Sequence, residues 1–198
     1  MAHAPSPTIS FVDALWPAQG AGRLVRAVLL ALVGSALLTL SAKLQVPFYP
    51  VPMTMQTLVA LLIGLAYGFP LGFATVLLYL AEGAAGLPVF AGTPEKGIGL
   101  AYMAGPTGGY LVGFALAAAI TGWIAERRRD IGALALAVIA GSIAIYLPGV
   151  LWLARFVGFE QALGLGLAPF LLGDILKAVL ALALALAGAD MVRRRLQG

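Results

Sequence analysis

Two ionisable residues lie close together inside an apolar run near the end of the chain. Asp174 and Lys177 are three positions apart in Gly173-Asp174-Ile175-Leu176-Lys177, a spacing that puts both on one face of a helix. A charge at the centre of a membrane helix costs about 2.5–3.5 kcal/mol on insertion scales. Two interpretations follow, an ion pair that holds helices together or a polar site that faces a cavity, and the second is the default for ionisable groups at membrane depth.

Two loops carry apolar and aromatic residues where solvated connectors would be polar. The first runs from Lys43 to Gln56, includes Phe48 and Tyr49, and is stiffened by Pro47, Pro50 and Pro52, since each proline fixes φ and removes an N–H donor. The second contains Leu87-Pro88-Val89-Phe90 and Gly105-Pro106-Thr107, and its length of about 21 residues exceeds the usual 4–6. Such loops are typical of a lid over a pocket, and a belt of aromatic residues at a membrane interface is the alternative.

Motifs for enzyme chemistry are missing from the sequence. There is no cysteine, the lone histidine, His3, lies in a polar N-terminal tail, and no Gly-x-x-x-x-Gly-Lys-Ser/Thr or Gly-x-Ser-x-Gly motif is present. Those motifs would have indicated nucleotide binding or a serine nucleophile. We therefore expect no enzyme activity, no metal and no cofactor.

The composition indicates the elements that must position the Asp-Lys pair. Apolar residues make up 62% of the 198 residues and charged residues only 10%, whereas soluble domains carry roughly 25% charged residues. Lipid is the solvent for so much apolar surface, and continuous apolar runs predict helices rather than a β-barrel. We predict an all-α, polytopic membrane protein with six transmembrane helices, the second and third of them short. They span Leu24–Ala42, Met53–Tyr67, Leu71–Gly86, Gly108–Ala125, Ile131–Ala154 and Pro169–Ala189.

The basic residues predict the orientation of these helices. Eight of the twelve flank the spans on one side, namely Arg23, Arg26, the runs 127–129 and 193–195. Lys43, Lys96 and Arg155 lie on the other side. Positive residues stay inside, so we expect both termini in the cytoplasm and the protein in the bacterial cytoplasmic membrane. We expect one domain over residues 1–198, in which 1–22 form a cytoplasmic tail rather than a signal peptide.

Two features near the N-terminus have two interpretations each. Phe11, Val12, Leu15 and Trp16 fall at helical spacing, which fits either a short helix on the membrane surface or a frayed tail. The first span carries a stripe of small residues, which permits close helix approach. The stripe serves packing within this chain or contact with a partner, and consists of Ala27, Ala31, Ser35 and Thr39.

Four stretches together resemble the BioY family, the biotin-binding S components of energy-coupling factor (ECF) transporters. The resemblance extends from the first span to the last. The stretches are Val51-Pro52-Met53-Thr54-Met55-Gln56-Thr57, Gly83-Ala84-Ala85-Gly86-Leu87-Pro88-Val89-Phe90, Gly105-Pro106-Thr107-Gly108-Gly109-Tyr110 and Gly173-Asp174-Ile175-Leu176-Lys177. The resemblance implies a six-helix bundle that captures biotin outside, and as partners a transmembrane T component that contacts Ala27, Ala31 and Ser35, together with two cytoplasmic ATPases.

The same resemblance implies roles for individual residues. Asp174 would accept from a ureido N–H of biotin and Lys177 would donate to the ureido carbonyl, with Gln56 also at the site. Phe48, Tyr49, Phe90 and Tyr146 would contact the sulfur ring and the valeryl chain. Family members often carry a polar residue such as asparagine after the Pro-Val-Phe run, where this chain has Ala91-Gly92-Thr93, so Thr93 or backbone groups would replace it. Lys43, Lys96 and Arg155 all remain candidates for binding the biotin carboxylate.

Three other functions compete with biotin capture. The first alternative is an S component for another vitamin, whose ring Asp174 and Lys177 would recognise. The second alternative is a proton-coupled carrier that works alone, in which Asp174 takes up a proton in each cycle. A membrane enzyme is the third alternative, and the empty motif search disfavours it.

Overall fold

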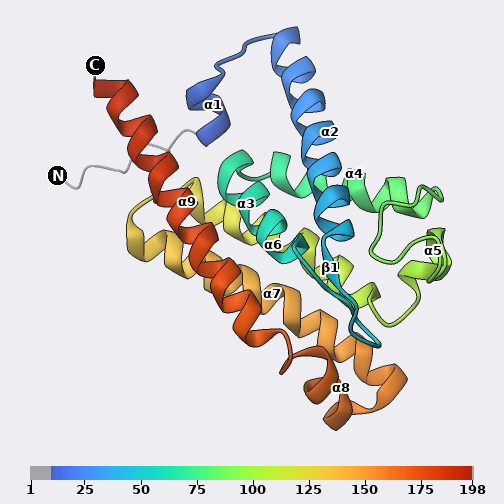
Figure 1. The fold of residues 1–198 in the computed structure, drawn as a ribbon. Coiled ribbons are helices and arrows are strands. Elements are labelled where there is room, and N and C mark those ends of the chain that lie inside the picture. Colours follow the sequence, from blue (N-terminus) through green and yellow to red (C-terminus); the bar gives the residue numbers. More distant parts are fainter. Residues whose placement is uncertain (1–9, 198) are drawn as a thin grey trace.

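The structure, a computed structural model, describes residues 10–197 and the side chains of residues 10–194; His3 and the start of the predicted tail lie outside this range. Most of the described residues are helical, and the only strands among them form a two-stranded hairpin (Figure 1). The helices are α1 Phe11–Leu15, α2 Ala21–Lys43, α3 Gln56–Tyr67, α4 Leu71–Ala84, α5 Gly99–Met103, α6 Gly108–Ala125, α7 Ile131–Val157, α8 Phe159–Gly166 and α9 Leu171–Gln197. The strands are β1 Gln45–Val46 and β2 Met53–Thr54.

The predicted apolar runs correspond to α2, α3, α4, α6, α7 and α9. In the described part of the chain four helices are long and apolar enough to cross a membrane, namely α2, α6, α7 and the part of α9 from Leu171 to Arg194. The helices α3 and α4, of 12 and 14 residues, are shorter apolar helices, as the sequence predicted. The all-α polytopic class is confirmed. Among the described residues, the candidate spans number four by this criterion and six when the two short helices are included.

Several predicted boundaries differ from those of the structure. Residues Met53 and Thr54 do not begin the second span but form β2, with Gln45 opposite Thr54 and Val46 opposite Met53. The prolines at 47, 50 and 52 account for this, because they disfavour helix and hold the backbone extended. The helix α7 continues beyond Ala154 to Val157, with Pro148 inside it. The short helices α5 and α8 occupy segments that were predicted only as connections.

Close helix contacts at glycine build the core around α6. This helix packs most extensively on α7 and also on α3 and α4. A Cβ at Gly113 would lie 2.7 Å from the backbone of Ile145 in α7, and one at Gly64 in α3 would overlap α6 at Ala118 and Thr121. Small residues of this kind let membrane helices approach to backbone contact. They therefore fix α3, α6 and α7, three of the elements that hold the site.

The N-terminal segment forms α1, which packs against α3 and α9. Ser10 caps the helix by accepting from the Asp13 N–H. The buried Arg26 of α2 donates to the Trp16 carbonyl and pairs with Asp13 at 2.5 Å. The sequence left a short helix or a frayed tail open for this segment, and the structure shows a helix. The placement of this helix on a membrane surface stays a prediction.

The two predicted groups of basic residues lie at opposite ends of the bundle. Arg26 holds α1, and Arg129 lies with Phe11 and Gly188 around one cavity, so this end gathers α1, the loop after α6 and the end of α9 (Figure 1). Lys43 contacts residues 90–93, and Arg155 lies over the Trp152 ring near Gly105. The end with the β-hairpin, α5 and α8 therefore holds the sparser set.

Candidate functional site

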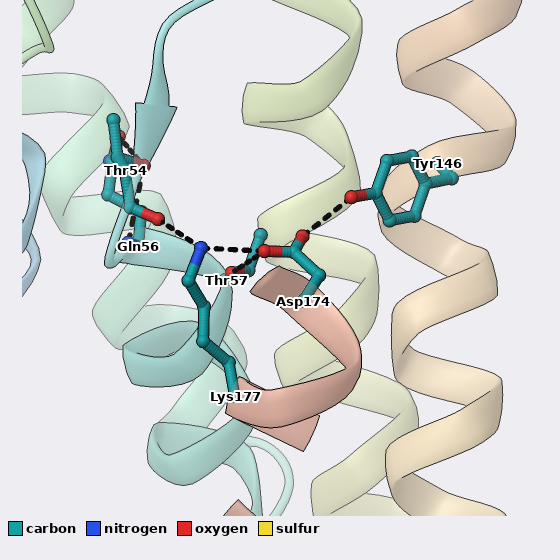
Figure 2. Close-up of polar contacts among 6 residues, drawn as sticks. All are labelled: Thr54, Gln56, Thr57, Tyr146, Asp174 and Lys177. Carbon is teal, nitrogen blue, oxygen red and sulfur yellow. Dashed lines mark hydrogen bonds and ion pairs between the residues drawn. The ribbon is translucent and has the colours of Figure 1, made fainter. Parts of the chain in front are cut away.

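The first turns of α9 present the acidic and the basic residue to the interior of the bundle (Figure 2). Lys177 Nζ donates to Asp174 Oδ1 over 2.6 Å, and the two side chains are 10% and 12% exposed. Lys177 Nζ also donates to the Thr54 carbonyl oxygen over 2.7 Å. Within the described part of the chain the ammonium thus uses two of its three donors, and one is left for an acceptor on a ligand.

The Asp174 carboxylate collects donors from three elements. Besides Lys177, Thr57 Oγ1 of α3 donates to Oδ1 over 3.2 Å, and Tyr146 Oη of α7 donates to Oδ2 over 2.6 Å. A carboxylate offers about four lone-pair positions, so one acceptor position remains. Because the carboxylate is enclosed and hydrogen-bonded to three partners, removing it would leave several polar groups unpaired in a region of low dielectric constant.

A second hydrogen-bonded network begins at Thr54, the last residue of β2. Gln56, which is 3% exposed, donates from Nε2 to Tyr79 Oη over 2.8 Å, and Tyr79 donates to the Val89 carbonyl oxygen over 3.2 Å. Thr54 Oγ1 lies 3.3 Å from both the Gln56 side-chain oxygen and its backbone nitrogen. This network links the start of α3, through Tyr79 of α4, to the loop that follows α4.

A cavity lies against both polar groups. The empty space between its lining atoms, counted together with the open solvent at its mouth, is about 510 Å³. Its polar lining consists of Thr54, Gln56, Thr57, Thr107, Asp174 and Lys177. Its apolar and aromatic lining consists of Val51, Pro52, Met53, Ala91, Tyr102, Tyr110, Leu111, Phe114, Ile145, Tyr146 and Phe170. Both loops predicted to form a lid therefore contribute to its wall.

The structure brings four of the seven predicted ligand-binding residues together around this cavity. Asp174, Lys177, Gln56 and Tyr146 line it. The other three do not reach it.

Two of these three, Phe48 and Phe90, instead pack against residues that line the cavity. Phe90 is fully buried behind the wall, stacked on Tyr102 with ring centroids 5.0 Å apart. Phe48 is 39% exposed and meets Phe170 edge-to-face at 5.9 Å. Tyr49 is 87% exposed.

None of the cations considered for the ligand carboxylate lines the cavity. Lys43 Nζ contacts the Phe90 carbonyl and Thr93, and the Arg155 guanidinium lies 5.1 Å from the centre of the Trp152 ring. Lys96 is exposed, with its stem beside Gly92. The Thr93 hydroxyl, considered as a substitute for asparagine, donates to the Phe90 carbonyl over 2.7 Å and does not line the cavity.

The small residues of α2 turn partly into the bundle. Ser35 is 1% exposed and donates to the Glu82 carboxylate of α4. Ala27 and Ala31 are half-buried. Of the two interpretations of this stripe, packing within the chain applies to Ser35, whose side chain has almost no exposed surface for contact with a partner.

Comparison with known proteins extends this description. The sequence model of the BioY family matches residues 12–194 of the chain. The chain belongs to the BioY family. Among its relatives are a probable biotin transporter BioY of Pyrococcus horikoshii, 42% identical over 82% of this chain and 91% of that protein, and the biotin transporter BioY of Thermotoga maritima, 36% identical over 82% and 95%. A crystal structure described as the S-component for biotin from an ECF-type ABC transporter shares the fold, with a TM-score of 0.69 over 91% of this chain and 96% of that one at 23% identity.

Several residues that line the cavity of this BioY chain were not singled out from the sequence. Thr54 and Thr57 lie in the stretch shared with the family, so the resemblance pointed to their segment without assigning them a role. The same holds for Tyr110 at the start of α6, the last residue of another shared stretch, whereas Phe170, in the connection before α9, lies outside all four stretches. Phenylalanine is common in packed cores, so only the folded arrangement shows that Phe170 lines the cavity.

Proposed function

We propose that the chain captures biotin as the substrate-binding S component of an ECF transporter. The observation that carries the proposal is the cavity in which a buried Lys177 and Asp174 keep one donor and one acceptor position for a ligand. The ureido ring of biotin offers a carbonyl acceptor beside N–H donors, which is the complement of that pair. Membership of the BioY family and the names of its relatives support biotin as the ligand.

The rest of the cavity suits the remainder of the molecule. Met53, Tyr102, Tyr110, Phe114 and Phe170 offer apolar contacts for the sulfur-containing ring and the valeryl chain. We retain Phe48 and Tyr49 as contacts at the edge, where a loop movement would bring them to the ligand, and Phe90 as support behind the wall. The carboxylate would point to the open end, where its hydration is preserved.

The proposal includes partners and a location. The transmembrane T component would lie along α2 near Ala27 and Ala31, and two cytoplasmic ATPases would supply the energy, since the chain has no phosphate-binding motif of its own. The chain would act as one domain without enzyme activity or a cofactor. It would lie in the cytoplasmic membrane with both termini inside.

Titration of the purified, detergent-solubilised chain tests the ligand. Biotin should bind with a stoichiometry of one, whereas thiamine, riboflavin and lipoic acid should not compete with it. Mass spectrometry of small molecules that co-purify would identify a ligand outside this panel. Saturable binding of another vitamin with no binding of biotin would replace the proposal by an S component of different specificity.

The proton-coupled carrier is separated by a transport assay. Proteoliposomes that contain this chain alone are loaded with a proton gradient and given labelled biotin. The proposal predicts binding without accumulation until the T component and the ATPases are reconstituted with ATP. Accumulation by the chain alone that a protonophore abolishes would favour the carrier.

A further inference from the structure

Three consecutive carbonyl groups in the loop after α4 are each held by a side chain from a different helix. The Val89 carbonyl accepts from Tyr79 Oη of α4 over 3.2 Å, the Phe90 carbonyl from Lys43 Nζ of α2 over 3.0 Å, and the Ala91 carbonyl from Tyr102 Oη of α5 over 2.7 Å. We call residues 89–91 the wall segment. Ala91 of this segment lines the cavity, so the three donors fix one side of the candidate site.

Lys43 makes the most extensive of these contacts. It is the last residue of α2, and besides the Phe90 carbonyl its Nζ reaches Thr93 Oγ1 at 3.1 Å and the Thr93 carbonyl at 3.3 Å. An ammonium group has three N–H donors, and three loop oxygens take them up. Such a cation holds the loop and has no donor left for a ligand carboxylate.

The packing around Phe90 makes the wall segment sensitive to that hold. The ring is fully buried, with Tyr79 edge-to-face at 5.4 Å on one side and Tyr102 stacked at 5.0 Å on the other. The ring also fills the space that a Cβ at Gly83 would occupy. Close packing of this kind leaves the ring only one position. A shift of the Phe90 backbone carbonyl would therefore also move the neighbouring Ala91.

We propose that Lys43 is a positioning residue for ligand binding. Its ammonium group fixes the wall segment, and through that contact the outer end of α2 sets the shape of the cavity. A displacement of α2 relative to α4 would therefore change the affinity of a cavity that α2 does not itself line. The identity of the ligand rests on the proposed function; the hold on the wall segment does not.

The test compares Lys43→Met with Lys43→Arg and with Glu95→Gln, an exposed charge in the same loop. Biotin and its uncharged methyl ester are titrated into each purified protein. We expect Lys43→Met to weaken both ligands by the same factor, about fivefold, because hydrogen bonds from a charged donor are among the stronger ones. Lys43→Arg should recover part of the loss, and Glu95→Gln should bind both like the parent protein.

Hydrogen exchange of the ligand-free proteins provides the second measurement. The Thr93 N–H is bonded to the Phe90 carbonyl that Lys43 holds, so the amides of residues 89–93, 95 and 96 should exchange faster in Lys43→Met than in the parent, and at the parent rate in Glu95→Gln. Unchanged exchange overturns the proposal, as does a loss of affinity for biotin that spares the methyl ester, which would make Lys43 a direct partner of the carboxylate. If the parent binds neither ligand, the proposed function fails, and exchange alone decides whether Lys43 holds the segment.

Discussion

Asp174 and Lys177 form an ion pair of 2.6 Å across one turn of α9, and each side chain has only about a tenth of its surface exposed. Enclosed pairs of this kind contribute little net stability when intact, because desolvation offsets the attraction, but breaking one is costly. The pair is bonded to Thr54, Thr57 and Tyr146 on β2, α3 and α7. It therefore joins three elements at the place where a ligand would lie.

Replacing Asp174 should weaken biotin binding. Asp174→Ala removes the acceptor of Lys177, Tyr146 and a ligand N–H together, and we expect at least a tenfold loss, which corresponds to about 1.4 kcal/mol. Asp174→Asn should lose less, since its carbonyl accepts one bond. Calorimetric titration of monodisperse protein measures this, with Glu160→Gln on the exposed face of α8 as the control. Parent-like affinity in folded Asp174→Ala would make the pair purely structural.

Tyr146→Phe isolates one contact of the same carboxylate. The substitution keeps the ring that lines the cavity and removes the hydroxyl group that donates to Asp174 Oδ2 over 2.6 Å. We expect an affinity loss between the parent and Asp174→Ala, roughly threefold to tenfold, since a hydrogen bond to a charged group contributes about 1.5–3 kcal/mol of which the ligand senses a part. A loss as large as that of Asp174→Ala would instead indicate direct contact between the hydroxyl group and the ligand.

The site shows what spacing predicts and what it does not. The i, i+3 relation placed Asp174 and Lys177 on one face, and the cavity lies on that face. Phe90 lies in a shared stretch, yet its ring packs between Tyr79 and Tyr102 and does not line the cavity. The sequence could not show this, because a loop has no periodicity from which the direction of a side chain can be predicted. The same reason hid the role of Lys43, whose partners lie 47 and 50 residues away.

The fold shows a similar division. Residues Gly108–Ala125 were predicted with the bounds that α6 has, because Pro106 precedes the apolar run and charged residues follow it. The β-hairpin was missed, since strands of two residues are too short to show alternation. The helix α9 runs beyond its predicted end, because the hydropathy pattern ends where the helix leaves the apolar region, although the backbone continues.

Gly113 should not tolerate a side chain. A Cβ there would lie 2.7 Å from the Ile145 backbone, and overpacking of this kind costs about 1–3 kcal/mol. We expect Gly113→Ala to lower the melting temperature in detergent. Gly164→Ala in α8, where the new Cβ has nothing within 4 Å, should leave it unchanged or raise it. Equal melting temperatures in both variants would show that α6 and α7 can separate without cost.

The contact between α1 and α2 should depend on the charge of Asp13. Burial raises the pKa of this carboxyl group, but hydrogen bonds from Ser10 and Arg26 and the charge of Arg26 outweigh it, so the pKa lies below its ordinary 3.8. A lowered pKa stabilises the docked helix above pH 3.8, and this contribution is lost as the pH falls through the lowered value. At neutral pH, Asp13→Asn should raise amide exchange in residues 11–16 roughly twofold to fivefold, since partly exposed pairs contribute about 0.2–1 kcal/mol. Asp190→Asn, a more exposed carboxylate on α9, should not; unchanged exchange in Asp13→Asn would show that apolar contacts hold α1.

The last prediction concerns the partner. Ala31 is half-buried on α2, four positions from Ser35, which the Glu82 contact takes into the bundle. The proposal that a T component approaches α2 near Ala27 and Ala31 requires small side chains there. Ala31→Leu should keep biotin affinity within about twofold, because the residue does not line the cavity, and should reduce uptake about tenfold in cells that contain the complete transporter, since a separation of the helices weakens assembly. Ala36→Leu, at an exposed position of the same helix, is the matched control and should retain both activities. Binding is measured on purified protein and uptake with labelled biotin in cells at equal expression. If Ala31→Leu loses binding, the residue serves packing between α2 and α4; if it keeps full uptake, the T component lies elsewhere.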